Sequence, residues 1–518
     1  MMNNTVKPSL RQGITLANLS LPLSPAFITA FGVLLITVIA LFTAPYVGMA
    51  DNGDFFRSIY SNGLYFNLPD YDSQYFGYFV KQYGIFQYFN ENGAMLFSSQ
   101  SLFIKLAIGL NKLFFSSEVF DIRFQAAIYT ILYVIAIYLL IEAITWRMSR
   151  KQGFIIAGIA IFIFGDTGYT AYFNSFYGES VVMIMMIFMF ASWLMLYRKR
   201  YNDYAMLAVF VISTLILTTS KQQNAPVGMI IAVLGCSLLW IRRDKIFRIL
   251  TMASLALMLF AGVFTYLNIS NEFVNINQFH AMTRGVLKES PDPEAALKAL
   301  GMDEQYAILK NSIHYEKYVT IDVNSPLLEE NFYSRYGFVS ILKYYLTNPD
   351  QLNSILNVAA QSAFSIKPAA MGNYEQSVGK EFRAQSHFFT GYSQLKLTLA
   401  PRTFGFIFLW MVLVIGLYMP SFVNSIKLRD FRGMQRMVLI VASIGIGLSG
   451  IFVSIIGAGD ADISKHEFLF TLSFDLVTFL TLSSVIGRRV SKNSNQVKQV
   501  SKSTLSRPYT KPQKDVSV

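Results

Sequence analysis

Long, uninterrupted apolar runs dominate the pattern of hydrophobic and polar positions along the chain. A membrane-spanning helix needs about 20 mostly apolar residues, and ten runs approach or exceed that length. They cover residues 24–46, 122–146, 154–173, 180–197, 204–220, 225–241, 247–267, 403–420, 437–456 and 467–486. The pattern therefore predicts an all-α polytopic membrane protein with a bundle of about ten transmembrane helices.

The stretches between these runs predict five parts. Pro291-Asp292-Pro293-Glu294 is a typical helix start, and segment 332–357 places apolar residues at helical spacing, so the long loop is expected to be helical. The end of the chain is rich in Ser, Lys, Gln and Pro and cannot bury a core. We expect a cytoplasmic N-terminus over 1–23, an N-terminal transmembrane module over 24–267 with external loop 47–121, an external helical domain over 268–402, C-terminal transmembrane helices over 403–486, and a disordered basic cytoplasmic tail over 487–518.

Composition supports the membrane assignment. The chain is 53% hydrophobic and 14% charged, whereas soluble proteins have about 25% charged residues. Disordered, collagen-like, disulfide-rich and coiled-coil classes are excluded by the same values. The single cysteine, Cys236, lies in an apolar run and is expected to be a small core residue.

The net charge of +12 raises the question of an anionic partner, and the distribution of charge answers it. More than half of the Lys and Arg residues lie in the two terminal segments and in four short connections, around 147–151, 198–200, 242–248 and 427–436. Loops 47–121 and 268–402 carry at least as many acids as bases. Because Lys and Arg are retained on the cytoplasmic side, we expect a multi-pass protein of the plasma membrane with both termini cytoplasmic and no nucleic-acid partner.

Four polar clusters lie where predicted helices reach the external side. They are Asp51 to Arg57, Asp166 with Asn174 to Glu179, Thr219 to Lys221, and Gly459 to Glu467. Charge near hydrocarbon costs several kcal/mol unless it is paired or faces water. Four clusters at one depth therefore predict a shared external cavity suited to chemistry at the membrane surface.

The first cluster has the most specific spacing. Asp54 is expected in the first turn of a helix, where an ionised carboxylate is favoured and can act as a general base on a hydroxyl. Arg57, on the same helix face, suits a phosphate. By spacing alone, Asp51 and Asp54 could equally be helix caps, with Arg57 as a salt-bridge partner.

The other clusters supply candidate ligands. Lys221 is either an interfacial snorkelling lysine or a phosphate ligand, and the Lys465-His466 pair either contacts phosphate or pairs locally with Asp462. His466 has no second histidine at metal-site spacing, and Asp475, inside the last span, is expected to pair within the bundle. The candidates for binding sugar or acceptor, several of which could instead be helix caps, are Asp166, Tyr172, Asn174, Tyr177, Glu179, Asp460 and Asp462.

Several of these segments together resemble the GT-C superfamily of polyprenyl-phosphate-sugar-dependent glycosyltransferases. The run Asp54-Phe55-Phe56-Arg57 is similar to the D-x-x-R motif of members whose first external loop begins with an acidic residue. With Tyr172 to Glu179, Gly372-Asn373-Tyr374-Glu375 and Ala461 to Leu476, the order resembles WsfD-type hexose transferases of bacterial surface-glycan synthesis.

The resemblance implies an inverting transfer of a hexose from a polyprenyl-phosphate carrier to a glycan acceptor on the external face. The catalytic acid of the family maps onto Asp54, with Asp51 second. Arg57 corresponds to the motif arginine as a donor-phosphate ligand, whereas Lys221, Arg284, Lys465 and His466 are candidates by charge and predicted side. The residues predict no metal site, although the resemblance leaves a divalent metal open, because only some relatives use one.

Two other functions remain open from the sequence. A lipid-linked glycan flippase or other transporter would place ligand groups near the bilayer midplane, often in repeated halves, whereas these acids cluster externally and no repeat is visible. A non-catalytic protein of envelope assembly would tolerate the loss of Asp54. The P-loop, HExxH and GxSxG motifs are absent from the sequence.

Overall fold

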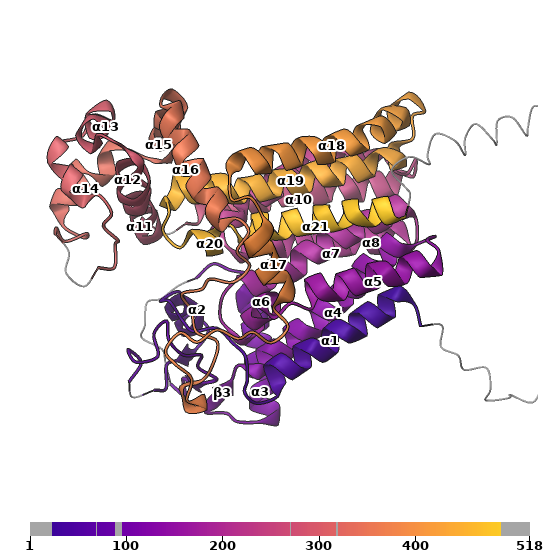
Figure 1. Ribbon diagram of the computed structural model, residues 1–518, viewed down its shortest axis with the longest axis horizontal. Helices are drawn as coiled ribbons and strands as arrows, with labels where there is room; N and C mark the ends of the chain where they lie inside the picture. The colour runs from indigo at the N-terminus through magenta and orange to yellow at the C-terminus, as the bar shows by residue number, and fades with distance from the viewer. Residues whose placement is uncertain (1–22, 69, 89–95, 270, 317–319, 488–518) are drawn as a thin grey trace, which may run out of the picture.

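Long helices run side by side in the computed structural model, which describes residues 23–487 apart from 69, 89–95, 270 and 317–319 (Figure 1). The predicted N-terminal segment and basic tail lie almost entirely outside the described residues. Among the described residues, nine helical stretches are long and apolar enough to cross a membrane. They are α1 (Pro25–Phe42), α4 (Arg123–Thr145), α7 (Glu179–Arg198), α8 (Asp203–Ser220), Gln222–Trp240 containing α9 (Ala225–Leu234), α10 (Lys245–Leu267), α18 (Phe404–Lys427), α19 (Phe431–Ala458) and α21 (Phe468–Ile486).

A tenth stretch is bent. The predicted straight span 154–173 is instead α5 (Arg150–Phe164) followed by α6 (Thr167–Thr170) and a 3₁₀ turn to Asn174, at an angle of 46°. The Asp166 carboxylate accepts the Gly168 backbone N–H at 2.7 Å and starts a new helix there. The fold class is therefore confirmed, and the bend corrects one predicted span.

Helix α7 forms the centre of the bundle and is buried along almost its whole length. Helices α4, α8, α19 and α21 all pack against it. The outer helices expose apolar side chains, as expected of surfaces that face lipid. Cys236 is exposed rather than in the core as predicted, because Gly235 and Leu238 form the buried side of the short helical turn that carries it.

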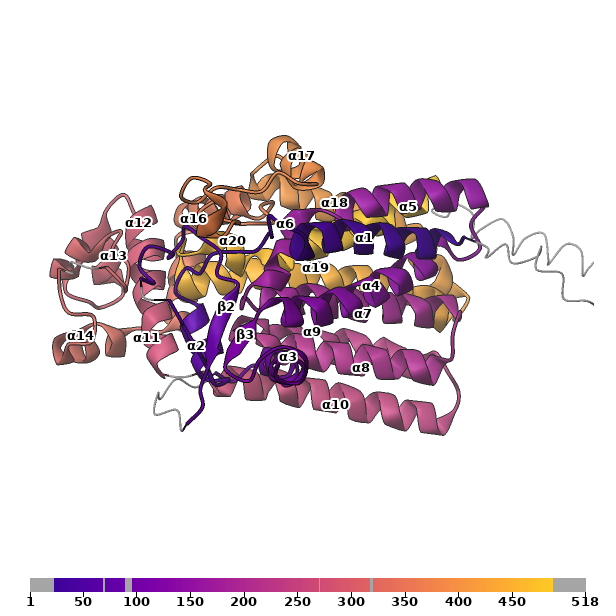
Figure 2. The same ribbon diagram turned by 90° about the horizontal axis from the view of Figure 1, so that it is seen from below.

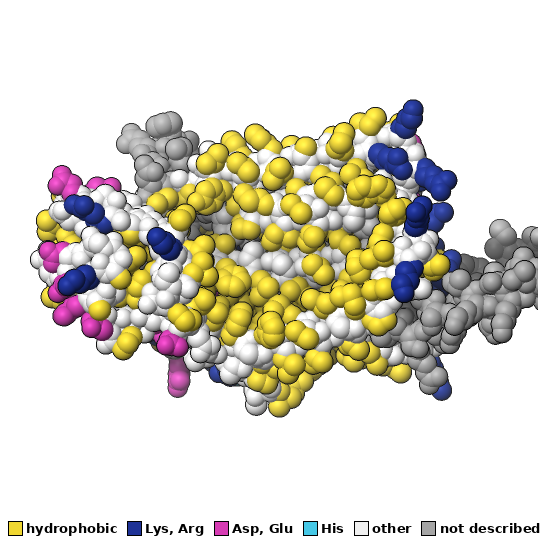
Figure 3. Space-filling view, turned by 90° about the horizontal axis from the view of Figure 1, so that it is seen from above, with side chains coloured by type: hydrophobic (Ala, Val, Ile, Leu, Met, Phe, Trp, Pro, Cys, Tyr) yellow, Lys and Arg dark blue, Asp and Glu magenta, His cyan; other side chains and the backbone are white. Residues whose placement is uncertain are grey.

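Charge separates toward the two ends of the bundle. In Figure 3, Lys and Arg gather at one end and most Asp and Glu at the other, with an apolar surface between them. At the basic end, Arg200 pairs with Glu142 at 2.9 Å and Arg432 pairs with Asp203 at 2.9 Å. This separation is the one expected of a membrane protein, and the cytoplasmic side of the basic end stays a prediction.

The first loop folds at the acidic end. It contains α2 (Phe55–Tyr60), α3 (Gln100–Phe114) and an unpredicted antiparallel sheet of β1 (Leu64–Tyr65), β2 (Gln82–Ile85) and β3 (Val119–Asp121) in that order. The register pairs Leu64 with Ile85 and Tyr83 with Phe120. Figure 2 shows α3 nearly end-on, across the direction of the long helices.

The second loop forms a helical unit with its own core at the same end. Tyr306, Phe332 and Tyr345 pack in this core together with Ile455 of α19 and Phe470 of α21, so the unit rests on the bundle. Its helices are α11 (Asn271–His280), α12 (Leu287–Glu289), α13 (Pro293–Ala299), α14 (Pro326–Asn331), α15 (Phe338–Thr347) and α16 (Pro349–Ser362), and the following α17 (Gly391–Leu399) packs instead against α5 of the bundle.

Residues 371–374 clamp the first loop from outside. The Ala50 N–H donates to the Gly372 carbonyl at 2.9 Å, and the Phe79 N–H donates to the Tyr374 carbonyl at 2.9 Å. A Cβ at Gly372 would lie 1.8 Å from the Gly77 carbonyl oxygen, so only glycine allows this approach. The clamp fixes the backbone just before Asp51.

Candidate active site

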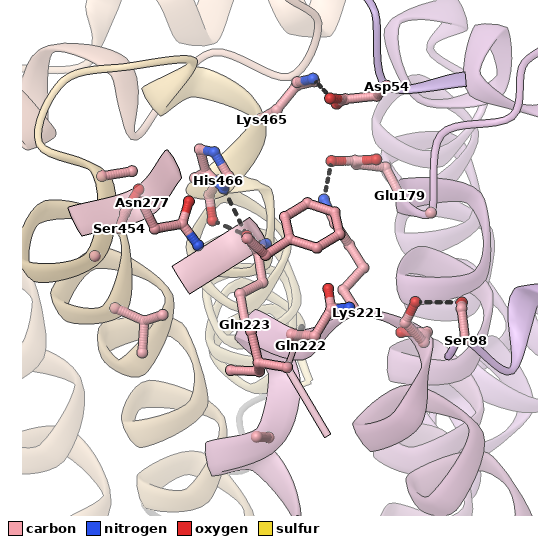
Figure 4. A pocket seen from close by; sticks show the side chains of 18 of the residues that line it. Asp54, Ser98, Glu179, Lys221, Gln222, Gln223, Asn277, Ser454, Lys465 and His466 are labelled. Carbon is pink, nitrogen blue, oxygen red and sulfur yellow. Dashed lines mark hydrogen bonds and ion pairs between the residues drawn. The ribbon is translucent and has the colours of Figure 1, made fainter. Parts of the chain in front are cut away.

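A cavity of about 390 Å³ opens where the first loop, the external helices and the ends of the spanning helices meet. Its wall includes α2, the start of α7, the break between α8 and α9, the ends of α10 and α19, α11, and α20 (Ile463–His466). Figure 4 shows the polar side chains that face it. All four predicted clusters contribute to this wall, and the cluster around Asp166 does so through residues 176–179 but not through Asp166 itself.

Asp51 and Asp54 have different roles. The Asp51 Oδ1 accepts the backbone N–H groups of Gly53 at 2.8 Å and Phe55 at 3.1 Å, and Oδ2 accepts the Tyr71 hydroxyl. Gly53 completes this turn with a φ of +105°, which favours glycine. The Asp51 side chain thus holds the turn that leads into α2, whereas Asp54, which occupies the N-cap position but makes no side-chain cap hydrogen bond, lines the cavity.

Asp54 pairs with Lys465, 411 positions away in the sequence. The Asp54 side chain is 56% exposed, whereas that of Lys465 is 3% exposed. Desolvation acts to raise the pKa of Asp54, but Lys465, Lys221 and His466 outweigh it and lower the pKa to about 2. Asp54 is therefore ionised and accessible at neutral pH.

A second ion pair lies on the same wall. Lys221 follows the last residue of α8 in extended conformation, and its Nζ contacts Glu179 Oε1 at 2.7 Å. The other carboxylate oxygen of Glu179 is buried and has no hydrogen-bond partner among the described residues. Lys221 thus has an ion-pair partner and lines the cavity.

Arg57 does not pair with Asp54. Its guanidinium contacts Glu272 at 2.8 Å and lies 3.9 Å from the ring centroid of Phe273, both in α11. This contact joins α2 to the external unit at the edge of the cavity. With Lys221 and Lys465, Arg57 gives the wall three cations against the two carboxylates of Asp54 and Glu179.

His466 is held by Gln223, in the turn after α8. The His466 Nδ1 and the Gln223 Oε1 are 2.6 Å apart. Desolvation together with Lys221 and Lys465 lowers the pKa of His466 to about 4. The imidazole is therefore neutral at pH 7.

Another part of the wall is largely apolar. Pro226 in α9, Tyr266 in α10 and Phe452 in α19 belong to it, and the Tyr266 and Phe452 side chains are exposed. One cavity thus joins a charged part of the wall to an apolar one.

Five of the seven predicted sugar- or acceptor-binding residues do not line the cavity, and Asp166, Tyr172 and Asn174 are three of them. Asp166 accepts the Ser393 backbone N–H at 2.8 Å, the Tyr172 hydroxyl donates to the Ile366 carbonyl at 3.1 Å, and the Asn174 amide donates to the Val47 carbonyl at 2.9 Å. All three are buried and hold loops against the bundle.

The remaining predicted residues, Arg284, Asp460 and Asp462, also form contacts within the chain. Arg284 binds Asp460 through two nitrogens at 2.7 and 3.0 Å, away from the cavity lining. Asp462 accepts the Asn52 amide at 2.8 Å and lies 3.5 Å from Lys465. The local pairing of Lys465 with Asp462 is therefore present, but the stronger contact of Lys465 is with Asp54.

The sequence analysis did not single out four polar residues of the wall: Gln222, Gln223, Asn277 and Ser454. The two glutamines follow Lys221 in a polar break between two apolar runs, and that break was the available signal. Asn277 and Ser454 carry no local signal, since helix packing alone turns them toward the cavity.

Protein ligands for a metal ion were also sought. Within the part of the chain that the structure describes, no three or more His, Cys, Asp or Glu side chains are arranged to hold one. The divalent metal that the resemblance leaves open therefore has no ready-made site among these residues.

Comparison with known protein families gives one match that covers almost the whole chain. Residues 10–503 match the family model described as the YfdI N-terminal transmembrane domain. No curated protein matches the chain.

Proposed function

The chain belongs to the YfdI N-terminal transmembrane domain family, a GT-C-like family of membrane glycosyltransferases, and from that premise we propose that it transfers a hexose from a polyprenyl-phosphate carrier to a hydroxyl of a cell-surface glycan. The observation that carries this proposal is the ionised, accessible carboxylate of Asp54 in a cavity with a charged end and an apolar side. The apolar side suits a lipid chain, and the cations suit its phosphate.

The proposed reaction is a single displacement. The Asp54 carboxylate takes the proton of the acceptor hydroxyl, and the oxygen forms a bond to the anomeric carbon of the sugar. The bond between that carbon and the phosphate oxygen breaks, and its electron pair leaves with the polyprenyl phosphate. Attack opposite to the leaving group inverts the anomeric configuration.

The cations of the wall act on the leaving group in this proposal. The phosphate gains negative charge as the bond breaks, and Lys221, Lys465 and Arg57 stabilise that charge. The Lys465 ammonium group would then contact both the phosphate and Asp54. Because Lys465 contributes to the low pKa of Asp54, donor binding would raise this pKa and make Asp54 a stronger base.

The competing transporter function has less support. The cavity lies at the ends of the spanning helices, whereas transporters bind ligands near the midplane. Asp475, the acid inside a span, is bound to Lys396 at 2.7 Å and to the Tyr392 hydroxyl at 2.6 Å, so it is fully occupied within the bundle.

The proposal is tested with purified protein, a polyprenyl-phosphate hexose and a surface-glycan acceptor. Replacement Asp54→Asn removes the base and keeps the shape, and we expect transfer to fall about 10²- to 10⁴-fold with an unchanged melting temperature. The control is Asp72→Asn, an exposed acid of the same loop, which should keep full activity. Full activity of Asp54→Asn would refute the assignment of the base, and lipid-linked sugar crossing vesicles without transfer would favour a transporter.

The external position of the cavity has a separate test. In a Cys236→Ala background, Lys298→Cys places a thiol at a position that is 79% exposed on the external unit, and Lys245→Cys places one at the basic end. A membrane-impermeant thiol reagent added to intact cells should label position 298 and leave position 245 unlabelled. The reverse pattern would invert the topology.

A further inference from the structure

One side of the cavity wall carries polar side chains that make no hydrogen bond to other described residues. The Ser454 hydroxyl is buried and has no hydrogen-bond partner among the described residues. The side chains of Gln222 and Asn277 also line the cavity, and neither is joined to another described residue by a hydrogen bond. Figure 4 shows these groups around His466, beside the two ion pairs. They can donate or accept hydrogen bonds, yet none of them is charged.

Gln223 determines which nitrogen of His466 carries the proton. The Gln223 Nε2 donates to the His466 backbone carbonyl at 3.4 Å, which leaves the amide oxygen 2.6 Å from His466 Nδ1. An amide oxygen has no hydrogen, so Nδ1 is the donor in this contact. In a neutral imidazole the other nitrogen, Nε2, is then a hydrogen-bond acceptor.

The charges around His466 keep it neutral. Burial and the nearby Lys221 and Lys465 lower the pKa of His466 to about 4, against the opposite effect of Asp462 and Asp54. Both of those carboxylates are themselves in contact with Lys465. A neutral acceptor nitrogen offers a phosphate oxygen no proton, whereas a sugar hydroxyl can donate to it.

We infer that His466 binds a hydroxyl of the transferred sugar through Nε2, that Gln223 is a positioning residue for it, and that Gln222, Asn277 and Ser454 complete a sugar subsite. This inference rests on the proposed function, since the ligand is the sugar of a polyprenyl-phosphate donor. It reassigns His466 from the predicted phosphate contact to sugar recognition. Lys221 and Lys465 remain the proposed ligands of the donor phosphate.

Two probes separate these roles: a polyprenyl phosphate without sugar and the same lipid carrying glucose. We expect the wild-type protein to bind the glucose-bearing lipid more tightly. His466→Phe should weaken binding of that lipid by about 3- to 10-fold, as the loss of one hydrogen bond predicts, and should leave binding of the sugar-free lipid unchanged. His387→Phe, at an exposed histidine outside the cavity, is the matched control and should change neither.

The positioning role of Gln223 has its own measurement. Histidine labelled with ¹⁵N, with the His466 signals identified by their loss in His466→Phe, should show a neutral ring protonated on Nδ1 at pH 7. In Gln223→Glu the new carboxylate should stabilise the imidazolium, raise the pKa of His466 and abolish the preference for the glucose-bearing lipid.

Two results would overturn the inference. Equal weakening of both probes by His466→Phe would make His466 a phosphate contact, and an imidazolium or a proton on Nε2 in the wild type would remove the acceptor. Failure of the wild-type protein to bind either lipid would instead count against the proposed function, and the nitrogen shifts would still decide the protonation of His466.

Discussion

Two aspartate–lysine pairs join distant parts of the chain, and they differ in access. Asp54 pairs with Lys465 and leaves 56% of its side chain exposed to the cavity. Asp475 pairs with Lys396 at 2.7 Å, and these side chains are 0% and 4% exposed. The hydroxyls of Tyr392 and Tyr169 also donate to the Asp475 carboxylate.

The difference shows what burial does to the same chemical pair. At Asp475 the lysine and two hydroxyls contact both carboxylate oxygens and the side chain is enclosed, so a reactant cannot reach it, and the pair ties α17 to α21. At Asp54 one ammonium group contacts the carboxylate, and more than half of the aspartate side chain stays exposed. Access separates a structural pair from a candidate catalytic one.

The largest effect on stability is expected where the buried pair is broken. Asp475→Asn would leave Lys396 charged and buried without its partner, which costs about 3–5 kcal/mol. The melting temperature in detergent should fall strongly. The double replacement Asp475→Leu with Lys396→Leu removes both charges and should recover most of the loss. A stable single variant would show that the pair is not structural.

The clamp beside the open pair is the next test. Gly372→Ala places a methyl group 1.8 Å from the Gly77 carbonyl oxygen, and such overpacking costs about 1–3 kcal/mol. We expect a lower melting temperature and lower transfer, because the backbone before Asp51 must move. Gly109→Ala, in α3 with nothing within 4 Å of the new Cβ, is the control. Equal melting temperatures of Gly372→Ala and the wild type would show that the backbone of the clamp accommodates the methyl group without cost.

Removal of the cation tests the open pair itself. In Lys465→Met the pKa of Asp54 should rise from about 2, by about 1–3 pH units. Because a general base must be ionised, activity should then be lost at a higher pH as the solution is acidified. The pH dependence of kcat/KM measures this shift, and Lys298→Met, at an exposed lysine, should leave it in place. An unmoved acidic limb would mean that Asp54 does not titrate in the reaction.

The smallest effect concerns Asp51, a buried carboxylate without a cation. Burial raises the pKa of Asp51 to about 6, against the hydrogen bonds from Tyr71, Phe55 and Gly53. The folded protein therefore holds this proton more tightly than the unfolded chain, whose aspartate pKa is near 3.9. The resulting stability is present below about pH 4 and is lost as pH rises through 6.

Melting temperatures of the wild type and Asp51→Asn between pH 4 and 8 test this dependence. The wild type should lose stability relative to the variant between pH 4 and 6, by a few degrees at most. Asp72→Asn should follow the wild type throughout. Parallel curves for wild type and Asp51→Asn would show that Asp51 keeps its ordinary pKa in the folded protein.

Much of the architecture could be predicted because its causes are local. Apolar runs of spanning length predict helices wherever they occur, and the unequal distribution of Lys and Arg predicts the separation of charge seen in Figure 3. The place of Asp54 at the start of a short helix was also predictable, because an acid that follows a glycine at such a point can be recognised from a few neighbouring residues.

The partners of the site residues could not be predicted. Spacing favoured Arg57 as the neighbour of Asp54, yet packing places Lys465 there and turns Arg57 toward α11. Asp166, Tyr172 and Asn174 had polar side chains at suitable helix ends, yet backbone groups of distant segments occupy them. No rule of spacing predicts such contacts.

The sequence by itself determined that this chain spans a membrane many times, which of its segments are apolar, and which few acids lie at helix ends. Only the tertiary structure decided that the Asp51 carboxylate is used by the backbone of its own turn, that Asp54 is accessible, and that Asp475 is enclosed. The physical reason is the distance along the chain over which each effect acts. Hydrophobic runs and turn chemistry act over a few residues, whereas access and pairing depend on side chains brought together across hundreds of positions.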